Sequence, residues 1–128
     1  MARGRDEFQA HKAGVAALGR SLSRRAGSRC ELCGEGEGLR PIEVAGGPAE
    51  PDPEWALLAC ERCRDAIGPK PKWEAAELRF LETAVWSDVV PAQLAAVRLT
   101  RSLAASGVGW ATDLLDGLYL DPVVEGLL

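Results

Sequence analysis

The chain has 128 residues, with 15 lysine and arginine side chains against 19 aspartate and glutamate side chains, a net charge of −4. This mildly acidic balance argues against a protein that coats nucleic acid, because such a protein needs a strongly basic surface. The apolar share of 47% and the charged share of 27% are typical of a globular domain. No long apolar run or apolar leader is seen, so we expect no membrane association and a cytoplasmic location.

Charge divides the chain into three segments. Residues 1–29 carry seven basic and two acidic side chains, a net charge of +5. Residues 30–68 have a net charge of −6 and residues 69–128 one of −3. The sequence therefore predicts an N-terminal basic amphipathic helix, a four-cysteine zinc-ribbon module and a helical C-terminal segment, with these boundaries.

One amphipathic helix is predicted over residues 7–26, ended by Gly27. Its apolar residues recur at intervals compatible with a single face: Phe8, Val15, Leu18 and Leu22. The basic side chains of this segment could contact the phosphates of a nucleic acid or an acidic protein surface. A solvated helix end with a loose basic tail explains them more simply.

The middle segment is rich in glycine and proline, which excludes a long helix there. Two β-compatible runs remain, at residues 39–45 and 55–59, and an acidic, turn-rich stretch joins them. This pattern predicts a β-hairpin with a flexible tip. A short helix is expected to follow from about residue 60 to residue 67.

The last sixty residues are predicted to be helical. Helices are expected over residues 73–85, from Pro91 to about Ser106, and from Thr112 or Asp113 to Tyr119, with a final turn opened by Asp121 as its cap and Pro122. The four tryptophans are expected in the core: Trp55, Trp73, Trp86 and Trp110. An exposed Trp86 or Trp110 would instead mark a surface for a partner.

The four cysteines carry the clearest chemical signal. Cys30 and Cys33 form one pair with two residues between them, and Cys60 and Cys63 form another. In a reducing compartment such pairs indicate a metal rather than disulfides, and four sulfurs suit tetrahedral Zn²⁺. Because four thiolates leave no position open for water, we expect one structural zinc ion, without which the hairpin would lose its fold.

Three arginines stand beside the cysteines in the sequence: Arg29, Arg62 and Arg64. They could offset the charge of −2 on a zinc ion with four thiolates, or they could be ordinary solvated side chains. The sequence leaves both interpretations open.

The ordered set of motifs resembles the PhnA (YjdM) family, which is named for its association with alkylphosphonate-utilisation genes. The resemblance rests on residues 28–34 (SRCELCG), 57–63, 86–88 (WSD), 113–116 (DLLD) and 119–121 (YLD). It implies a zinc-ribbon module followed by a helical segment. The chain departs from the family in lacking the usual C-terminal β domain. It also has residues 77–80 (ELRF) where the family often has His-Trp-Arg-Cys.

Catalytic interpretations have weaker support. The cysteine frame is also similar to the treble clef of HNH endonucleases, but these enzymes need a histidine on the hairpin, and residues 41–45 contain none. His11, the single histidine, lies in the predicted N-terminal helix and is expected to face solvent. The carboxylates of Asp113, Asp116 and Asp121 could bind a hard cation, although helix capping explains them more simply.

The sequence thus predicts a small α+β protein with an N-terminal helix, a zinc-ribbon or treble-clef-like β-hairpin holding the four-cysteine site, and a helical C-terminal half. The expected function is that of a non-catalytic, cytoplasmic zinc-binding module of PhnA type that acts through protein–protein contacts. The alternative is a degenerate HNH-like treble clef with residual nucleic-acid binding.

Overall fold

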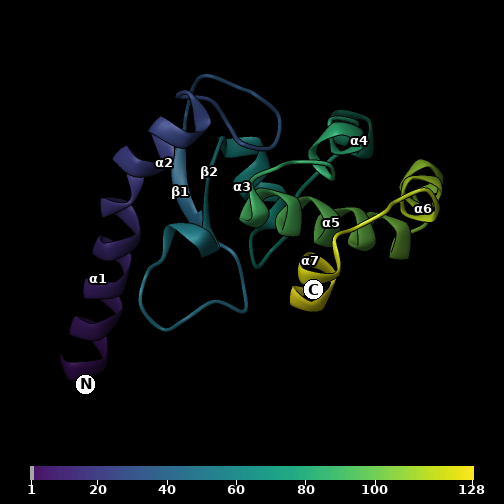
Figure 1. The fold of residues 1–128 in the computed structure, drawn as a ribbon. Coiled ribbons are helices and arrows are strands. Elements are labelled where there is room, and N and C mark those ends of the chain that lie inside the picture. The colour runs from purple at the N-terminus through teal and green to yellow at the C-terminus, as the bar shows by residue number, and fades with distance from the viewer. Residues whose placement is uncertain (1) are drawn as a thin grey trace.

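A two-stranded antiparallel hairpin stands between two groups of helices in the computed structural model, which describes residues 2–128 (Figure 1). Two helices lie on the N-terminal side of the hairpin, and the remaining helices lie on its other side (Figure 1). The α+β arrangement predicted from the sequence is therefore confirmed. No helix within residues 2–128 is both long and apolar enough to cross a bilayer.

Eleven helical and strand elements follow one another along the described residues. In order they are α1 (Ala2–Ala17), α2 (Gly19–Ala26), β1 (Arg40–Glu43), the 3₁₀ turn η1 (Pro53–Trp55), β2 (Ala56–Ala59), α3 (Glu61–Ile67), the 3₁₀ turn η2 (Ala75–Leu78), α4 (Leu81–Ala84), α5 (Val90–Ala105), α6 (Gly109–Asp116) and α7 (Pro122–Leu127).

The N-terminal segment forms two consecutive helices rather than the single predicted one. The break lies at Leu18, whose N–H donates to the carbonyl of Val15 at 3.0 Å. This bond spans three residues instead of four, so one turn of the helix is tightened. The predicted stop is confirmed, because Gly27 ends α2 in the left-handed conformation at φ 63°.

The hairpin follows the two predicted β runs, although both strands are shorter than expected. Arg40 pairs with Ala59 and Glu43 pairs with Ala56. Beyond the strands, the N–H of Val44 donates to the carbonyl of Trp55 at 2.7 Å. This hydrogen bond closes the end of the hairpin from which the long connection at residues 44–52 begins.

Strand β2 separates two hydrophobic cores, which explains why all four of its residues are buried. Leu57 and Ala59 belong to the main core, which extends through α3, α4 and α5. Ala56 and Leu58 point the other way and pack with Leu22 of α2 in a smaller core. The alternation of side chains along a strand produces this division.

The predicted helix over residues 73–85 is wrong in its extent, since only η2 and α4 form there. Glu82 and Thr83 donate to carbonyls three residues earlier, as in a 3₁₀ helix. A period of three places Leu78, Leu81 and Ala84 on one side, and all three are buried. Ala84 and Val85 donate to carbonyls four residues earlier, those of Phe80 and Leu81, so the segment continues as the short α-helix α4.

Glycine or proline lies at or near the first residue of each of the last three helices. The predicted helix start at Thr112 or Asp113 is wrong, because α6 begins at Gly109. Gly107, two residues earlier, adopts a left-handed conformation at the end of α5. This helix ends at Asp116, before Tyr119. The predicted cap at Asp121 is confirmed, since its carboxylate accepts from the N–H of Val123 at 2.8 Å.

Candidate metal centre

The structure brings together all four cysteines that the sequence indicated. The sulfurs of Cys30, Cys33, Cys60 and Cys63 all lie within 4.8 Å of one another. Three of these residues are buried, and Cys33 is half-buried. Among the histidine, cysteine, aspartate and glutamate side chains of residues 2–128, this is the one group placed closely enough to hold a metal ion.

The first pair of sulfurs is aimed by a tight turn ahead of the hairpin. The N–H of Cys30 donates to the carbonyl of Glu35 at 2.8 Å, and the N–H of Gly34 donates back to the carbonyl of Cys30 at 2.9 Å. Gly34 adopts φ 85°, a left-handed conformation that glycine accepts without strain. The turn therefore holds Cys30 and Cys33 on the same side.

The second pair lies where strand β2 passes into helix α3. Cys60 is the residue before the helix, and Cys63 lies within its first turn. The N–H of Arg64 donates to the carbonyl of Cys60 at 2.9 Å, which closes that turn. Helix geometry thus fixes the second pair, whereas a glycine turn fixes the first.

Hydrogen bonds among the thiols change their acidity in opposite directions. The pKa of Cys30 is lowered to about 4, chiefly because its sulfur accepts a hydrogen bond from Cys63. The pKa of Cys63 is raised because it donates that bond and is buried, and burial also raises the pKa of Cys60. Only a bound cation would hold all four sulfurs as thiolates at neutral pH.

The three arginines near the cysteines have different roles. The interaction of the Arg62 guanidinium with Cys33 and the neighbouring thiols raises the pKa of Arg62. Arg64 donates to the carbonyl of Ala59 at 2.7 Å and to that of Gly38, so it fixes backbone rather than sulfur. Arg29 contacts the carbonyl of Gly34 at 3.3 Å. Charge compensation at the sulfurs therefore rests mainly on Arg62.

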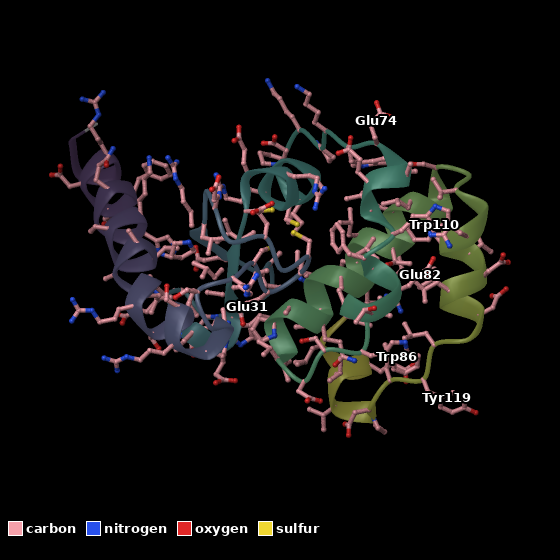
Figure 2. All side chains as sticks on the ribbon, turned by 90° about the horizontal axis from the view of Figure 1, so that it is seen from above. Glu31, Glu74, Glu82, Trp86, Trp110 and Tyr119 are labelled. Atoms are coloured by element: carbon pink, nitrogen blue, oxygen red, sulfur yellow. The ribbon has the colours of Figure 1, made fainter. Side chains whose placement is uncertain are left out.

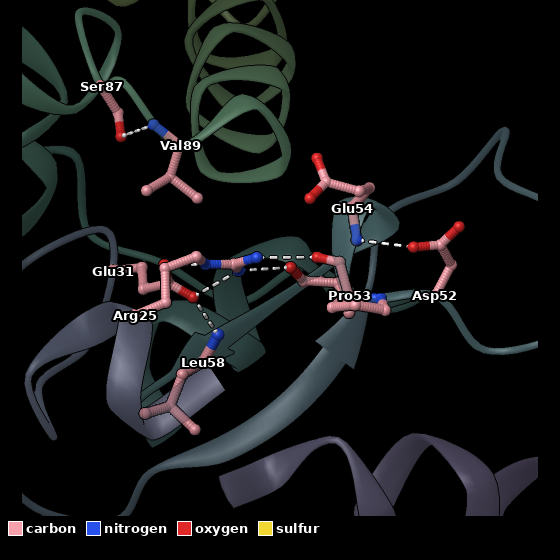
Figure 3. A network of polar contacts seen from close by, with 9 residues as sticks. Arg25, Glu31, Asp52, Pro53, Glu54, Leu58, Ser87 and Val89 are labelled. Carbon is pink, nitrogen blue, oxygen red and sulfur yellow. Dashed lines mark hydrogen bonds and ion pairs between the residues drawn. The ribbon is translucent and has the colours of Figure 1, made fainter. Parts of the chain in front are cut away.

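An ion pair that sequence reasoning missed joins the first pair of cysteines to helix α2. Glu31, between Cys30 and Cys33, accepts two hydrogen bonds from Arg25 and a third from the N–H of Leu58 at 2.9 Å (Figure 3). Arg25 also donates to the carbonyl of Pro53 at 2.8 Å (Figure 3). Two charges 6 residues apart in a polar stretch carry no signal of burial.

Other residues considered from the sequence lie outside the cysteine cluster. The ring Nε2 of His11 lies 2.5 Å from a carboxylate oxygen of Glu43, on strand β1. Asp113, Asp116 and Asp121 do not form a metal-holding group with any other described residue, and Asp121 caps α7. No cation site is therefore indicated at these carboxylates.

The tryptophans divide between the core and the surface. Trp55 and Trp73 are half-buried against the main core, in partial agreement with the expectation. Trp110 is half-buried and lies under the guanidinium of Arg79, 4.9 Å from its ring centre. Trp86 is 48% exposed. Figure 2 shows Trp86 and Trp110 on the side of the molecule away from α1.

Comparison with protein-family models, curated proteins and solved structures found no match for this chain. The geometry of the cysteines therefore carries the functional interpretation.

Proposed function

We propose that the chain is a non-catalytic zinc-binding module of PhnA type that acts in the cytoplasm through protein–protein contacts. The placement of the four sulfurs within 4.8 Å of one another supports the zinc-binding part of this proposal, and the PhnA type rests on the resemblance of the motifs alone. A tetrahedron of zinc–sulfur bonds of about 2.3 Å has edges of about 3.8 Å. The sulfurs of Cys33 and Cys60 are 3.5 Å apart, close to that edge. The residues present therefore fit Zn²⁺ well.

The order of elements favours a treble clef over the zinc ribbon that the resemblance to the PhnA family implies. A cysteine turn, a hairpin and a helix follow one another, and the second cysteine pair lies at the start of that helix. In a ribbon, both pairs would lie on turns. The treble-clef arrangement ties the hairpin to α3, and through α3 to the main core.

Three features support a structural rather than a catalytic metal. Four cysteine ligands fill a tetrahedral site and leave no position for water or substrate. Cys30, Cys60 and Cys63 are buried. His11, the chain's one histidine, pairs with Glu43 instead of approaching the sulfurs. We infer that zinc supplies folding energy, on the order of 10–16 kcal/mol in comparable modules.

Native mass spectrometry of the protein, purified without added metal, tests this proposal. We expect one zinc ion per chain in the wild type and none in Cys60→Ser, which should also melt at a lower temperature. Thr112→Ser, at an exposed position away from the cysteines, should keep both zinc and melting temperature. A wild-type chain without zinc, or a Cys60→Ser chain with full zinc and an unchanged melt, would contradict the proposal.

The alternative is a degenerate HNH-like treble clef that retains weak nucleic-acid binding. It is favoured by the exposed basic side chains of the N-terminal helices: Arg5, Lys12, Arg20 and Arg24. Such a surface binds phosphates with an affinity that falls steeply with salt. Filter binding at low salt decides this alternative, since the absence of any DNA or RNA affinity would remove it.

A further inference from the structure

Helix α1 leaves an open groove between itself and strand β1. The groove has a volume of about 750 Å³. Apolar side chains from both elements line it, including Phe8 and Val15 of α1 and Ile42 of β1. His11 and Glu43 pair across it, and they join the helix to the strand.

The rest of the protein covers few side chains of α1. From Gly4 to Ala17, only His11, Gly14 and Val15 are even half-buried. A helix of 16 residues is marginally stable in water without tertiary packing. Phe8, at the groove, is 64% exposed. An occupant of the groove would bury this ring and stabilise the helix.

The charges around the groove favour an acidic occupant. Lys12 and Arg40 both line it and are both exposed. Glu43 is the one acidic residue among the lining residues, and its carboxylate is already paired with His11. The basic character extends along residues 1–29, whose net charge is +5.

A segment with the complementary character lies in the same chain. Residues 113–125, which we call the acidic segment, contain four carboxylates, and no lysine or arginine follows Arg101. Tyr119 and Val123 in this segment are 88% and 73% exposed. Large apolar side chains exposed beside acidic ones match the apolar, basic groove.

The acidic segment does not reach the groove of its own chain. Helix α7 lies below α5, and α6 lies at the end of the molecule opposite α1 (Figure 1). Figure 2 shows Tyr119 on that far side as well. Contact between the two surfaces therefore requires two molecules.

We propose that the groove between α1 and β1 binds the acidic segment of a second copy of this chain. Tyr119 and Val123 of one copy would bury their side chains against Phe8 and the neighbouring apolar residues of the other. The acidic side chains would lie near Lys12 and Arg40, and the complementary charges would orient the encounter. This inference rests on the proposed function, whose protein partner it names.

Sedimentation velocity of the zinc-loaded full chain tests the proposal over a concentration range from about 1 μM to about 1 mM. We expect concentration-dependent self-association that weakens as salt is raised. Phe8→Asp disrupts the groove and Tyr119→Asp disrupts the acidic segment, so each should weaken self-association about tenfold or more. Trp86→Asp, a matched change of an exposed aromatic residue outside both surfaces, should leave it unchanged.

Mixing the two variants gives the sharpest test. The Phe8→Asp chain keeps an intact acidic segment, and the Tyr119→Asp chain keeps an intact groove, so an equimolar mixture should form heterodimers. A wild type that stays monomeric throughout would overturn the proposal and leave the groove to another partner, such as a nucleic acid. Association that neither variant weakens, or that mixing does not restore, would also overturn it.

Zinc content measured on the same samples separates the two proposals. A chain that binds one zinc ion but does not self-associate overturns only the present inference. A chain without zinc contradicts the proposed function whatever its oligomeric state. Circular dichroism of each variant confirms that these exposed substitutions leave the fold intact.

Discussion

Arg25 and Glu31 form a two-point ion pair in which Nε and one terminal nitrogen of the guanidinium donate to the two carboxylate oxygens, at 2.9 and 2.8 Å. The Glu31 side chain is only 3% exposed. It lies between the first two cysteines, so the pair fastens helix α2 to the candidate metal centre. The remaining donor of this network, the N–H of Leu58, belongs to strand β2.

Removal of Arg25 should destabilise the fold strongly. Arg25→Ala leaves the Glu31 carboxylate buried without its cation, and we expect the free energy of unfolding to fall by about 3 kcal/mol. Urea denaturation followed by circular dichroism measures this change. Arg24→Ala, next to it but exposed, should change stability by less than about 0.5 kcal/mol. Equal effects of the two substitutions would show that the ion pair contributes nothing.

Acid should release the proposed zinc. The bound state holds four thiolates and the free state holds protons in their place, so lowering the pH favours the metal-free protein. Cys60 and Cys63 have raised pKa values and take up protons first, whereas Cys30, with a pKa of about 4, takes one up last. We expect full zinc at neutral pH and progressive release as the pH is lowered towards 4, because protons compete with the metal for the thiolates.

A zinc-sensitive indicator dye, read after brief incubation at each pH, follows this release. Thr112→Ser serves as the control and should lose zinc over the same range. Zinc retained well below pH 4, or released on raising the pH from neutrality, would contradict a site of four thiolates.

Arg98 ties the C-terminal helix to the hairpin connection. Its guanidinium donates to the carbonyl of Ala45 at 2.7 Å and to that of Leu127 at 3.1 Å. Arg98→Met keeps the length of the side chain but removes both bonds, so we expect faster amide hydrogen exchange in α7. Arg101→Met, exposed on the same helix, should leave the exchange rates of α7 unchanged.

Two glycines should respond in opposite ways to an added methyl group. A Cβ at Gly47 would lie 2.7 Å from Cβ and Cγ of Trp55, so Gly47→Ala must displace the ring. We expect a lower melting temperature and altered tryptophan fluorescence. Gly126→Ala, within α7 and with open space around it, should raise stability by about 0.5–1 kcal/mol. A neutral Gly47→Ala would mean that the hairpin connection yields freely around Trp55.

The cysteines and the hairpin could be predicted from the sequence because their signals are local. Two residues between cysteines restrict how the sulfurs can be placed, and glycine and proline exclude other structures nearby. The cap at Asp121 is similarly local, since its carboxylate reaches an N–H two residues ahead. Patterns of this kind depend on no distant partner.

The features that sequence reasoning missed depend on contacts between distant segments. The burial of Glu31 requires Arg25, Leu58 and strand β2 to meet, and no pattern within one segment records that meeting. The division of residues 73–85 into η2 and α4 likewise left no local signal, although Leu78 and Leu81 both join the main core.

Strand β2 is apolar on both faces, so hydrophobic burial alone does not fix how it aligns with β1. In a strand with one exposed face, a shift of the pairing by one residue would turn the apolar side chains out of the core. In β2 such a shift would only exchange its two apolar faces. Strand β2 is also held relative to the cysteine turn, where Glu31 donates its N–H to the carbonyl of Leu58 and its carboxylate accepts the N–H of Leu58 in return. Since Glu31 lies between two proposed zinc ligands, a bound zinc ion would also hold strand β2 in place along the cysteine turn, and its loss would free the strand to shift as well as lower the stability.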